Sequence, residues 1–216
     1  MLNRIIELLW NAFSIINIVG LKHCEKVEPL KNIDIEKFVE HTWYSQYQQI
    51  VSYQDINDLN CVTATYNLEK NRTVPLFDGT VISVYNYANK YKVNGDPVNT
   101  KNGMVICARL PDEKKSGSLL VAPCNFPNLF GGKYWIIGLG KHYEWLIVSG
   151  GQPHVKYEDG CTTYLNKTLN SGLWIFSKYS EIPKKLVTVP GIEPRILAGR
   201  HIKPLRLYHC ATLLCA

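Results

Sequence analysis

The chain has 216 residues, of which 46% are hydrophobic, 11% aromatic and 19% charged. This length and hydrophobic content suit one folded domain with its own core and exclude intrinsic disorder. The formal net charge is +6, but the basic residues are scattered and no predicted helix carries a basic stripe, which excludes a nucleic-acid-binding footprint.

The first element is an apolar N-terminal segment. Arg4 gives it a positive start, and residues 5–21 are mostly apolar. The segment is too short and too polar for a membrane span, whereas its pattern, with Gly20 near a cleavage point, is typical of a secretory signal peptide. We therefore expect residues 1–22 to be a signal peptide. The alternative is an amphipathic helix that packs on the folded domain.

Eight β-strands are expected in the central part of the chain. Each is rich in Val, Ile, Thr, Tyr or Trp and is bounded by Gly, Pro, Asn or Asp. No long helical stripe interrupts the series, so an antiparallel sandwich or barrel is predicted rather than a βαβ fold. The expected strands are residues 43–53, 61–69, 80–88, 103–110, 118–124, 134–139, 144–149 and 172–178.

The last part of the chain is different. Prolines at positions 183, 190, 194 and 204 would interrupt any long helix. We expect residues 182–216 to form an irregular C-terminal tail.

Seven cysteines are spread along the chain, at positions 24, 61, 107, 124, 161, 210 and 215. None forms a Cys-x-x-Cys pair, so no metal site is expected. Wide spacing in a β-rich chain indicates disulfides and an oxidising compartment, although buried free thiols in a cytosolic protein are the alternative. Cys107 and Cys124 lie near the ends of two adjacent strands, where a cross-strand bridge fits unless the register slips. The triplets that begin at Asn71 and Asn166 are acceptor sequences for glycosylation, in keeping with export.

Alternation predicts which side chains face inward. In the second strand Ala64 and Tyr66 share one face, and in the fourth Ile106 opposes Cys107 and Arg109. The third strand is ambiguous between two sets, Val81/Ser83/Tyr85/Tyr87 and Ile82/Val84/Asn86.

Four segments, in order and at matching spacing, resemble the lipocalin family, in particular its apolipoprotein D-like and bacterial-type branch. They are residues 24–38 running into Thr42-Trp43-Tyr44, then Cys61-Val-Thr-Ala-Thr-Tyr66, then residues 134–140 with 143–149, and then Leu173-Trp-Ile-Phe-Ser-Lys178. The resemblance implies an eight-stranded antiparallel up-and-down barrel over residues 23–181. A barrel of this size leaves an interior that side chains fill or that holds one small ligand.

Three positions depart from the family pattern: His41 replaces a glycine, Gly140 an acidic residue, and Lys178 an arginine. In the family that arginine covers the tryptophan equivalent to Trp43 and closes the barrel floor. We expect Trp43 and Lys178 to form the floor here, with a cation–π contact of about 1 kcal/mol.

The resemblance also implies disulfide pairs. A cysteine before the first strand bonds to one after the seventh, which matches Cys24 with Cys161. Another on the second strand bonds to the tail, which matches Cys61 with Cys210 or Cys215. One cysteine stays unpaired in this scheme.

The inward residues form the candidate ligand-binding site, with Asn86 and the Tyr66 hydroxyl as the polar groups that orient a ligand. For any single residue, filling the core is the alternative role. For the third strand the resemblance prefers the set that contains Val84 and Asn86, and it adds the inward residues of the later strands. The candidate residues are Ala64, Tyr66, Val84, Asn86, Ile106, Val121, Ile136, Leu146, Val148, Trp174 and Phe176.

The predicted function is that of an extracellular carrier for a small hydrophobic molecule of retinoid, carotenoid, sterol, bilin or fatty-acid type. The sequence gives no reason to expect a cofactor other than a bound hydrophobic ligand or chromophore. Neither a nucleic-acid partner nor a membrane span is expected, and a homo- or hetero-oligomer remains open.

Two other classes of function are alternatives. A lipocalin-fold enzyme acting on a lipid or xanthophyll would need a barrel thiol or inward acids, but the only strand acids, Glu69 and Glu144, lie at strand ends. A pigment-complex or interaction subunit would need an exposed apolar patch. Candidates for that patch are Tyr85, Tyr87, Tyr91 and Trp145.

Overall fold

The computed structural model describes residues 24–49, 51, 54–98, 106–157, 160–163 and 172–180. The predicted signal peptide, the predicted tail and the acceptor Asn166 lie outside these residues. Asn71, the other acceptor, is exposed in the connection between the second and third strands.

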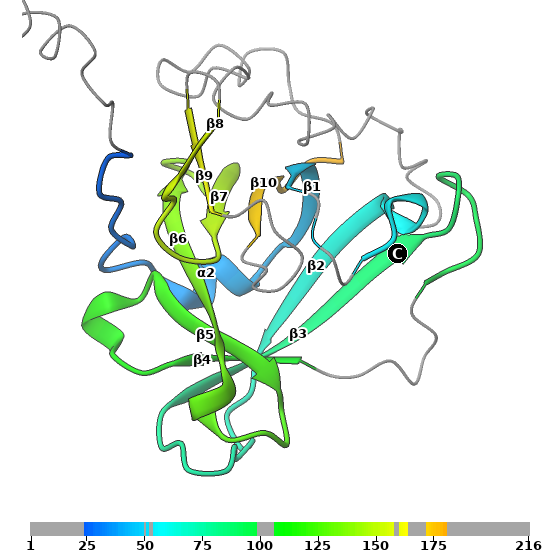
Figure 1. Cartoon of the computed structure of the whole chain (residues 1–216). Helices are drawn as coiled ribbons and strands as arrows, with labels where there is room; N and C mark the ends of the chain where they lie inside the picture. The colour runs from blue at the N-terminus through cyan, green and yellow to red at the C-terminus, as the bar shows by residue number, and fades with distance from the viewer. Residues whose placement is uncertain are drawn as a thin grey trace, which may run out of the picture.

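Eight antiparallel strands close into a barrel in the order β1-β10-β7-β6-β5-β4-β3-β2 (Figure 1). Strands that follow one another along the chain are therefore neighbours in space, apart from one inserted hairpin. This confirms the predicted eight-stranded antiparallel up-and-down barrel. The strands are β1 (Thr42–Gln48), β2 (Asn60–Leu68), β3 (Thr80–Asn89), β4 (Ile106–Leu110), β5 (Ser118–Pro123), β6 (Gly132–Leu139), β7 (Trp145–Ser149) and β10 (Leu173–Ser177).

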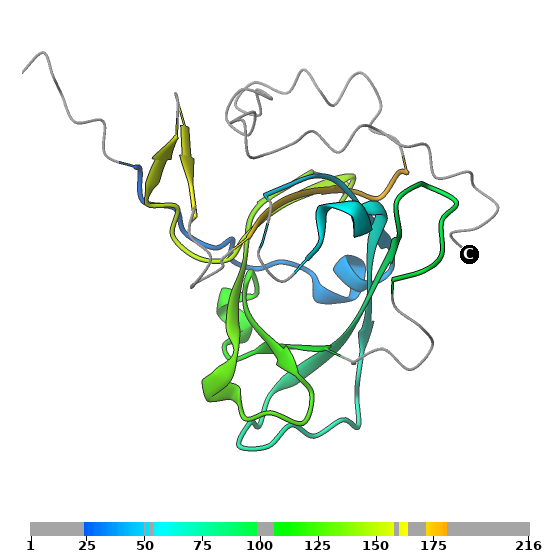
Figure 2. The same cartoon turned by 45° about the vertical axis from the view of Figure 1, so that its right-hand side comes forward.

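The inserted hairpin, which the sequence did not predict, consists of β8 (Val155–Tyr157) and β9 (Gly160–Thr162). Figure 2 shows it in yellow, projecting from the barrel wall. The Gln49 side chain at the end of β1 fastens it, because Gln49 Oε1 accepts hydrogen bonds from the hydroxyls of Thr162 (2.6 Å) and Thr163 (2.9 Å).

A short helix, α2 (Ile35–Val39), closes one end of the barrel. Asp34 caps it by accepting a hydrogen bond from the Lys37 backbone N–H, a typical N-cap interaction. The helix buries Phe38, whose carbonyl oxygen accepts a 3.0 Å hydrogen bond from Trp43 Nε1. Trp43 is fully buried beside Phe38, so its polar N–H is satisfied where water does not reach it.

The predicted contact between Lys178 and Trp43 is wrong. The Lys178 ammonium donates to the His142 carbonyl oxygen at 3.2 Å and lies 5.4 Å from the centre of the Tyr179 ring. A lysine has no planar guanidinium to lie flat on an indole, so its ammonium takes these surface partners instead. The His41 ring approaches Trp43 edge-on, with the centres of the two rings 6.4 Å apart.

The segment that leads to α2 packs against the barrel at the end that α2 closes. Leu30 donates its N–H to the Ile136 carbonyl oxygen (2.8 Å), and its own carbonyl oxygen accepts from the Gly117 N–H (3.0 Å). A Cβ at position 117 would lie 2.5 Å from that Leu30 oxygen. Only glycine permits this close approach of two backbones.

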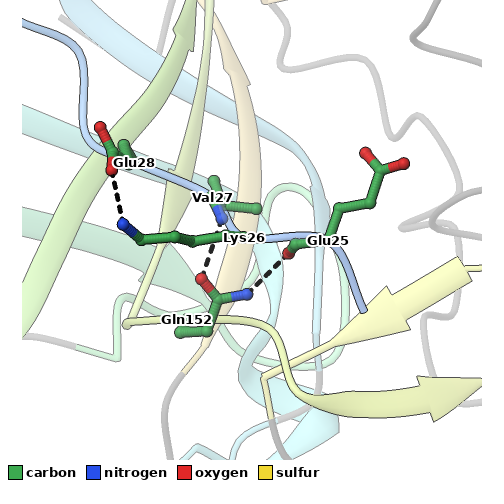
Figure 3. A network of polar contacts seen from close by, with 5 residues as sticks. All are labelled: Glu25, Lys26, Val27, Glu28 and Gln152. Carbon is green, nitrogen blue, oxygen red and sulfur yellow. Dashed lines mark hydrogen bonds and ion pairs between the residues drawn. The ribbon is translucent and has the colours of Figure 1, made fainter. Parts of the chain in front are cut away.

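The start of this segment is fixed to the residues after β7. Cys24 and Cys161 form a disulfide, as the family resemblance implied. Figure 3 shows how Gln152 adds two hydrogen bonds, accepting from the Val27 N–H (2.9 Å) and donating to the Glu25 carbonyl oxygen (2.8 Å).

A second disulfide joins Cys107 to Cys124, as predicted from their positions near the ends of adjacent strands. It lies on the outer face of the barrel, where Val74 and Val81 pack against Cys107. Cys61 is also disulfide-bonded. Its predicted partners, Cys210 and Cys215, lie outside the described residues.

Arg109 belongs to the outer face, as the alternation indicated, yet it is fully buried. Its guanidinium donates to the carbonyl oxygens of Cys107 (3.1 Å), Ala122 (3.4 Å), Pro123 (2.9 Å) and Phe126 (2.8 Å). The arginine therefore fastens the connection between β5 and β6 to the barrel wall. Burial lowers the pKa of this guanidinium.

Candidate functional site

The barrel contains a cavity of about 570 Å³. Pockets of this volume accept drug-sized ligands. The cavity extends from Phe176 and Tyr66 inside the barrel to the connections at the end opposite α2. Eight of the eleven predicted site residues border it, namely Ala64, Tyr66, Val84, Asn86, Ile106, Val121, Trp174 and Phe176.

The other three predicted site residues, Ile136, Leu146 and Val148, do not border the cavity. All three are fully buried in the main hydrophobic cluster. On the neighbouring strands β10 and β7, Trp174 lies opposite Val148 and Phe176 lies opposite Leu146. The larger rings of β10 line this side of the cavity, and the aliphatic residues beside them fill the core.

The third strand follows the set that contains Asn86 as far as Val84, whereas Asn86 itself is exposed. Ile82 and Val84 belong to the main cluster, and Asn86 borders the cavity. Val81 instead packs on the outer face, and Tyr85 is 49% exposed. Tyr87 departs from strict alternation, because it borders the cavity near the open end.

The deep part of the cavity holds a pair of tyrosine hydroxyls. The oxygens of Tyr66, on β2, and Tyr134, on β6, are 2.6 Å apart and share a hydrogen bond. The Tyr66 ring also lies 4.8 Å from the Phe38 ring of the closing helix. The pair therefore bridges opposite strands of the barrel just above its closed end.

Burial keeps both phenols neutral. It raises the pKa of Tyr66 far above the ordinary value for tyrosine, and the hydrogen bond with Tyr134 opposes this only in part. Burial raises the pKa of Tyr134 as well, and Tyr66 adds to that rise. Both hydroxyls stay protonated at any ordinary pH, so they act as hydrogen-bond donors and acceptors and not as bases.

Flat rings surround the hydroxyl pair. The rings of Tyr134 and Trp174 are stacked, with their centres 6.5 Å apart. The Trp174 ring occupies the space beside Gly172, where a Cβ would lie 2.1 Å from it. Gly172 thus allows Trp174 to occupy this position on the cavity wall.

The open end of the cavity is polar. Gln48 Nε2 donates to Gln54 Oε1 at 3.1 Å, and Asp55 and Asp58 border the cavity from the connection between β1 and β2. Lys133 borders it from the start of β6, with its ammonium 5.0 Å from the centre of the Trp135 ring.

The sequence prediction missed Tyr134 as a site residue. It is two positions from Ile136, which was placed inward, so the same alternation puts Tyr134 inward. The acids at the mouth lie in a connection, where no alternation applies. Other bordering residues that were not predicted are Leu59, Val62, Thr63, Ala88, Val98, Gly132, Gly150 and Gly172.

Other groups of the described residues bear on chemistry or assembly. Within the described ranges, no three His, Cys, Asp or Glu side chains are grouped so as to hold a metal ion, and no helix is long and apolar enough to cross a membrane. Of the tyrosines proposed for an assembly patch, Tyr85 and Tyr91 are exposed, at 49% and 78%. Trp145 is half-buried.

An eight-stranded barrel with a cavity open at one end defines a class of small-molecule-binding folds. No family model matches the sequence, and no curated protein matches it significantly. The barrel aligns with the major allergen Per a 4 from cockroaches at 18% identity and a TM-score of 0.49, covering 84% of this chain and 92% of that one.

It also aligns with insecticyanin from the tobacco hornworm Manduca sexta, at 17% identity and a TM-score of 0.44, over 76% of this chain and 74% of that one. With lobster apocrustacyanin A1 the identity is 15% and the TM-score 0.41, over 75% and 78%. These structures are lipocalins. Similarities this low carry no conclusion about family or ligand, so function has to be inferred from the cavity.

Proposed function

We propose that this chain is an extracellular lipocalin of the apolipoprotein D-like and bacterial-type branch, and that it carries a small hydrophobic molecule in its barrel without chemical change. The observation that carries the proposal is the cavity of about 570 Å³ inside the closed barrel, with an apolar and aromatic wall and uncharged hydroxyls at its deep end. Removing apolar ligand surface from water stabilises a complex by ~25 cal/mol per Å².

The disulfides support the extracellular setting. In the part of the chain that the structure describes, all five cysteines are disulfide-bonded, which is typical of oxidising compartments. Expression in a secreting eukaryotic cell tests this setting. We expect protein in the medium, with a mass that falls on glycosidase treatment if Asn71 or Asn166 is modified. Retention in the cytosol with reduced cysteines would contradict it.

Transport fits the lining better than catalysis. The described residues that border the cavity include no histidine and no cysteine, and their carboxylates, Asp55 and Asp58, lie at the mouth. Nucleophilic catalysis needs a nucleophile with an adjacent base. The neutral tyrosine pair supplies neither.

Tryptophan fluorescence tests the carrier proposal, because Trp174 borders the cavity and Trp135 does not. A panel of retinoids, carotenoids, sterols, bilins and fatty acids is titrated into the full chain. We expect at least one compound to quench emission saturably. The quenching should fall strongly in Trp174→Phe and be retained in Trp135→Phe. Unchanged emission across the panel, with no heat of binding by calorimetry, would contradict the carrier function.

A further inference from the structure

The charged groups that border the cavity all lie towards its open end. Asp55 and Asp58 belong to the connection before β2, and Lys133 is the second residue of β6, with its ammonium over the Trp135 ring. Among the described lining residues, the deep part offers the hydroxyls of Tyr66 and Tyr134. The polar groups at the buried end of the cavity are therefore uncharged oxygens.

The hydroxyl pair has hydrogen-bonding capacity left over. Each phenol carries one O–H donor and two acceptor lone pairs. One O–H is used within the pair, across 2.6 Å, and no other described group forms a hydrogen bond with either oxygen. One donor and several lone pairs thus face an apolar cavity, where a buried donor without a partner costs about 1–3 kcal/mol.

We infer that the cavity selects flat, mostly apolar molecules whose buried end is a neutral oxygen, either a hydroxyl or a carbonyl, and that the Tyr66–Tyr134 pair receives this oxygen. The inference rests on the proposed carrier function and adds the class of ligand to it.

The chemistry of the pair sets this preference. A carbonyl accepts the remaining phenol proton, and a hydroxyl both accepts that proton and donates to a phenol lone pair. A carboxylate at the same depth would meet one phenol donor and no described cation. The cost of removing its charge from water would therefore not be compensated. The stacked rings of Tyr134 and Trp174 form a flat wall beside the pair, which suits conjugated or ring-containing molecules.

Three ligands with the same carbon skeleton test the preference for a neutral oxygen on the full chain. Retinol, retinaldehyde and retinoic acid share a polyene and differ in the terminal oxygen group. We expect the alcohol and the aldehyde to bind about tenfold more tightly than the acid at neutral pH, by fluorescence titration. A saturated pair, 1-hexadecanol against palmitic acid, is compared by calorimetry, so that a cavity that excludes the polyene is still tested. Equal or tighter binding of the acids would overturn the inference.

Variants then assign the preference to the hydroxyls. Tyr66→Phe, Tyr134→Phe and the double variant keep the rings and remove the oxygens. We expect a loss of about tenfold for the alcohol and the aldehyde in the double variant, smaller losses in the single variants, and little change for the acid. Tyr85→Phe is the matched control, because Tyr85 is exposed on the outer face of β3. Thermal melting checks that each variant is folded.

The outcomes separate the inference from the carrier function. If no compound of either series or of the wider panel binds the wild-type chain, the carrier function fails, and the inference fails with it. If compounds bind but folded Tyr→Phe variants discriminate between alcohol and acid as the wild type does, only the inference is overturned.

Discussion

The buried guanidinium of Arg109 shows how one residue fixes a connection of the barrel. It donates to four carbonyl oxygens, at 2.8–3.4 Å: one on β4, two at the end of β5, and that of Phe126 in the connection between β5 and β6. Alternation alone placed this residue outward, and outward positions are usually solvated. The sequence carried no signal for the segment that covers it.

We expect Arg109→Lys to lower the free energy of unfolding by about 2–4 kcal/mol, because one ammonium cannot reach the four carbonyl oxygens to which Nη1 and Nη2 donate. Urea denaturation measures the change. Arg72→Lys is the control, since the Arg72 ion pair with Glu69 is 3.7 Å long and partly exposed, and it should change stability by less than about 0.5 kcal/mol. If both variants unfold like the wild type, Arg109 does not fasten the connection.

The buried tyrosines predict a specific response to alkali. Burial raises the pKa of Tyr66 in the folded chain above its value of about 10 in the unfolded chain. The contribution to stability is therefore fully present below about pH 10, and it is lost as the pH rises further, because the unfolded chain then releases a proton that the folded chain keeps.

We expect unfolding free energies that fall above about pH 10 by about 1.4 kcal/mol per pH unit for each such tyrosine. The Tyr66→Phe/Tyr134→Phe variant should show a shallower fall than the wild type, and Tyr85→Phe an unchanged one. Urea titrations at several alkaline pH values measure the slopes. A double variant with the wild-type slope would contradict burial of the pair.

At the scale of elements, the sequence predicted the barrel strands well and the connections between them poorly. Alternation and turn residues place each barrel strand, because both are local properties of the chain, but the first strand ends at Gln48 and not at residue 53. The hairpin β8–β9 consists of two three-residue strands, too short for a periodic pattern, and Gln49 holds it through contacts distant in sequence.

The candidate site shows the same division. Alternation and family resemblance placed eight residues on the cavity wall, but neither separates a wall residue from a core residue of the same parity. On β10 and β7 side-chain size makes this difference, since the Trp174 ring borders the cavity and its smaller neighbour Val148 does not. Tyr134 had the correct parity, yet its partnership with Tyr66 joins residues 68 positions apart and depends on barrel closure.

The closure of the barrel end predicts a strict need for glycine at position 117. A Cβ there would lie 2.5 Å from the Leu30 carbonyl oxygen and 2.9 Å from its nitrogen, so the incoming segment would have to move. We expect Gly117→Ala to destabilise the fold by about 1–3 kcal/mol in urea denaturation.

Gly132→Ala is the control for this prediction. A Cβ at position 132 would have its nearest neighbour at 3.7 Å, an ordinary contact. Its stability should stay near that of the wild type. Equal stability of the two variants would mean that the segment around Leu30 does not close the barrel as described.

At the scale of the whole molecule, the closed barrel and the segment packed against its end together form the cavity. Closure of eight strands leaves interior space, α2 and Trp43 seal one end of it, and the tyrosine pair gives the sealed end a neutral polar group. A carrier of hydrophobic molecules requires that this space is available to a guest.

The most direct test is the stoichiometry of binding to the wild type and to a variant with a filled cavity. Ala64 borders the cavity and is buried, so Ala64→Phe places a ring inside the barrel. Calorimetric titration with the tightest compound of the panel should give one site per wild-type chain and a loss of at least about tenfold in affinity for the folded variant. Undiminished binding by a folded Ala64→Phe chain would place the ligand outside the barrel and contradict the account.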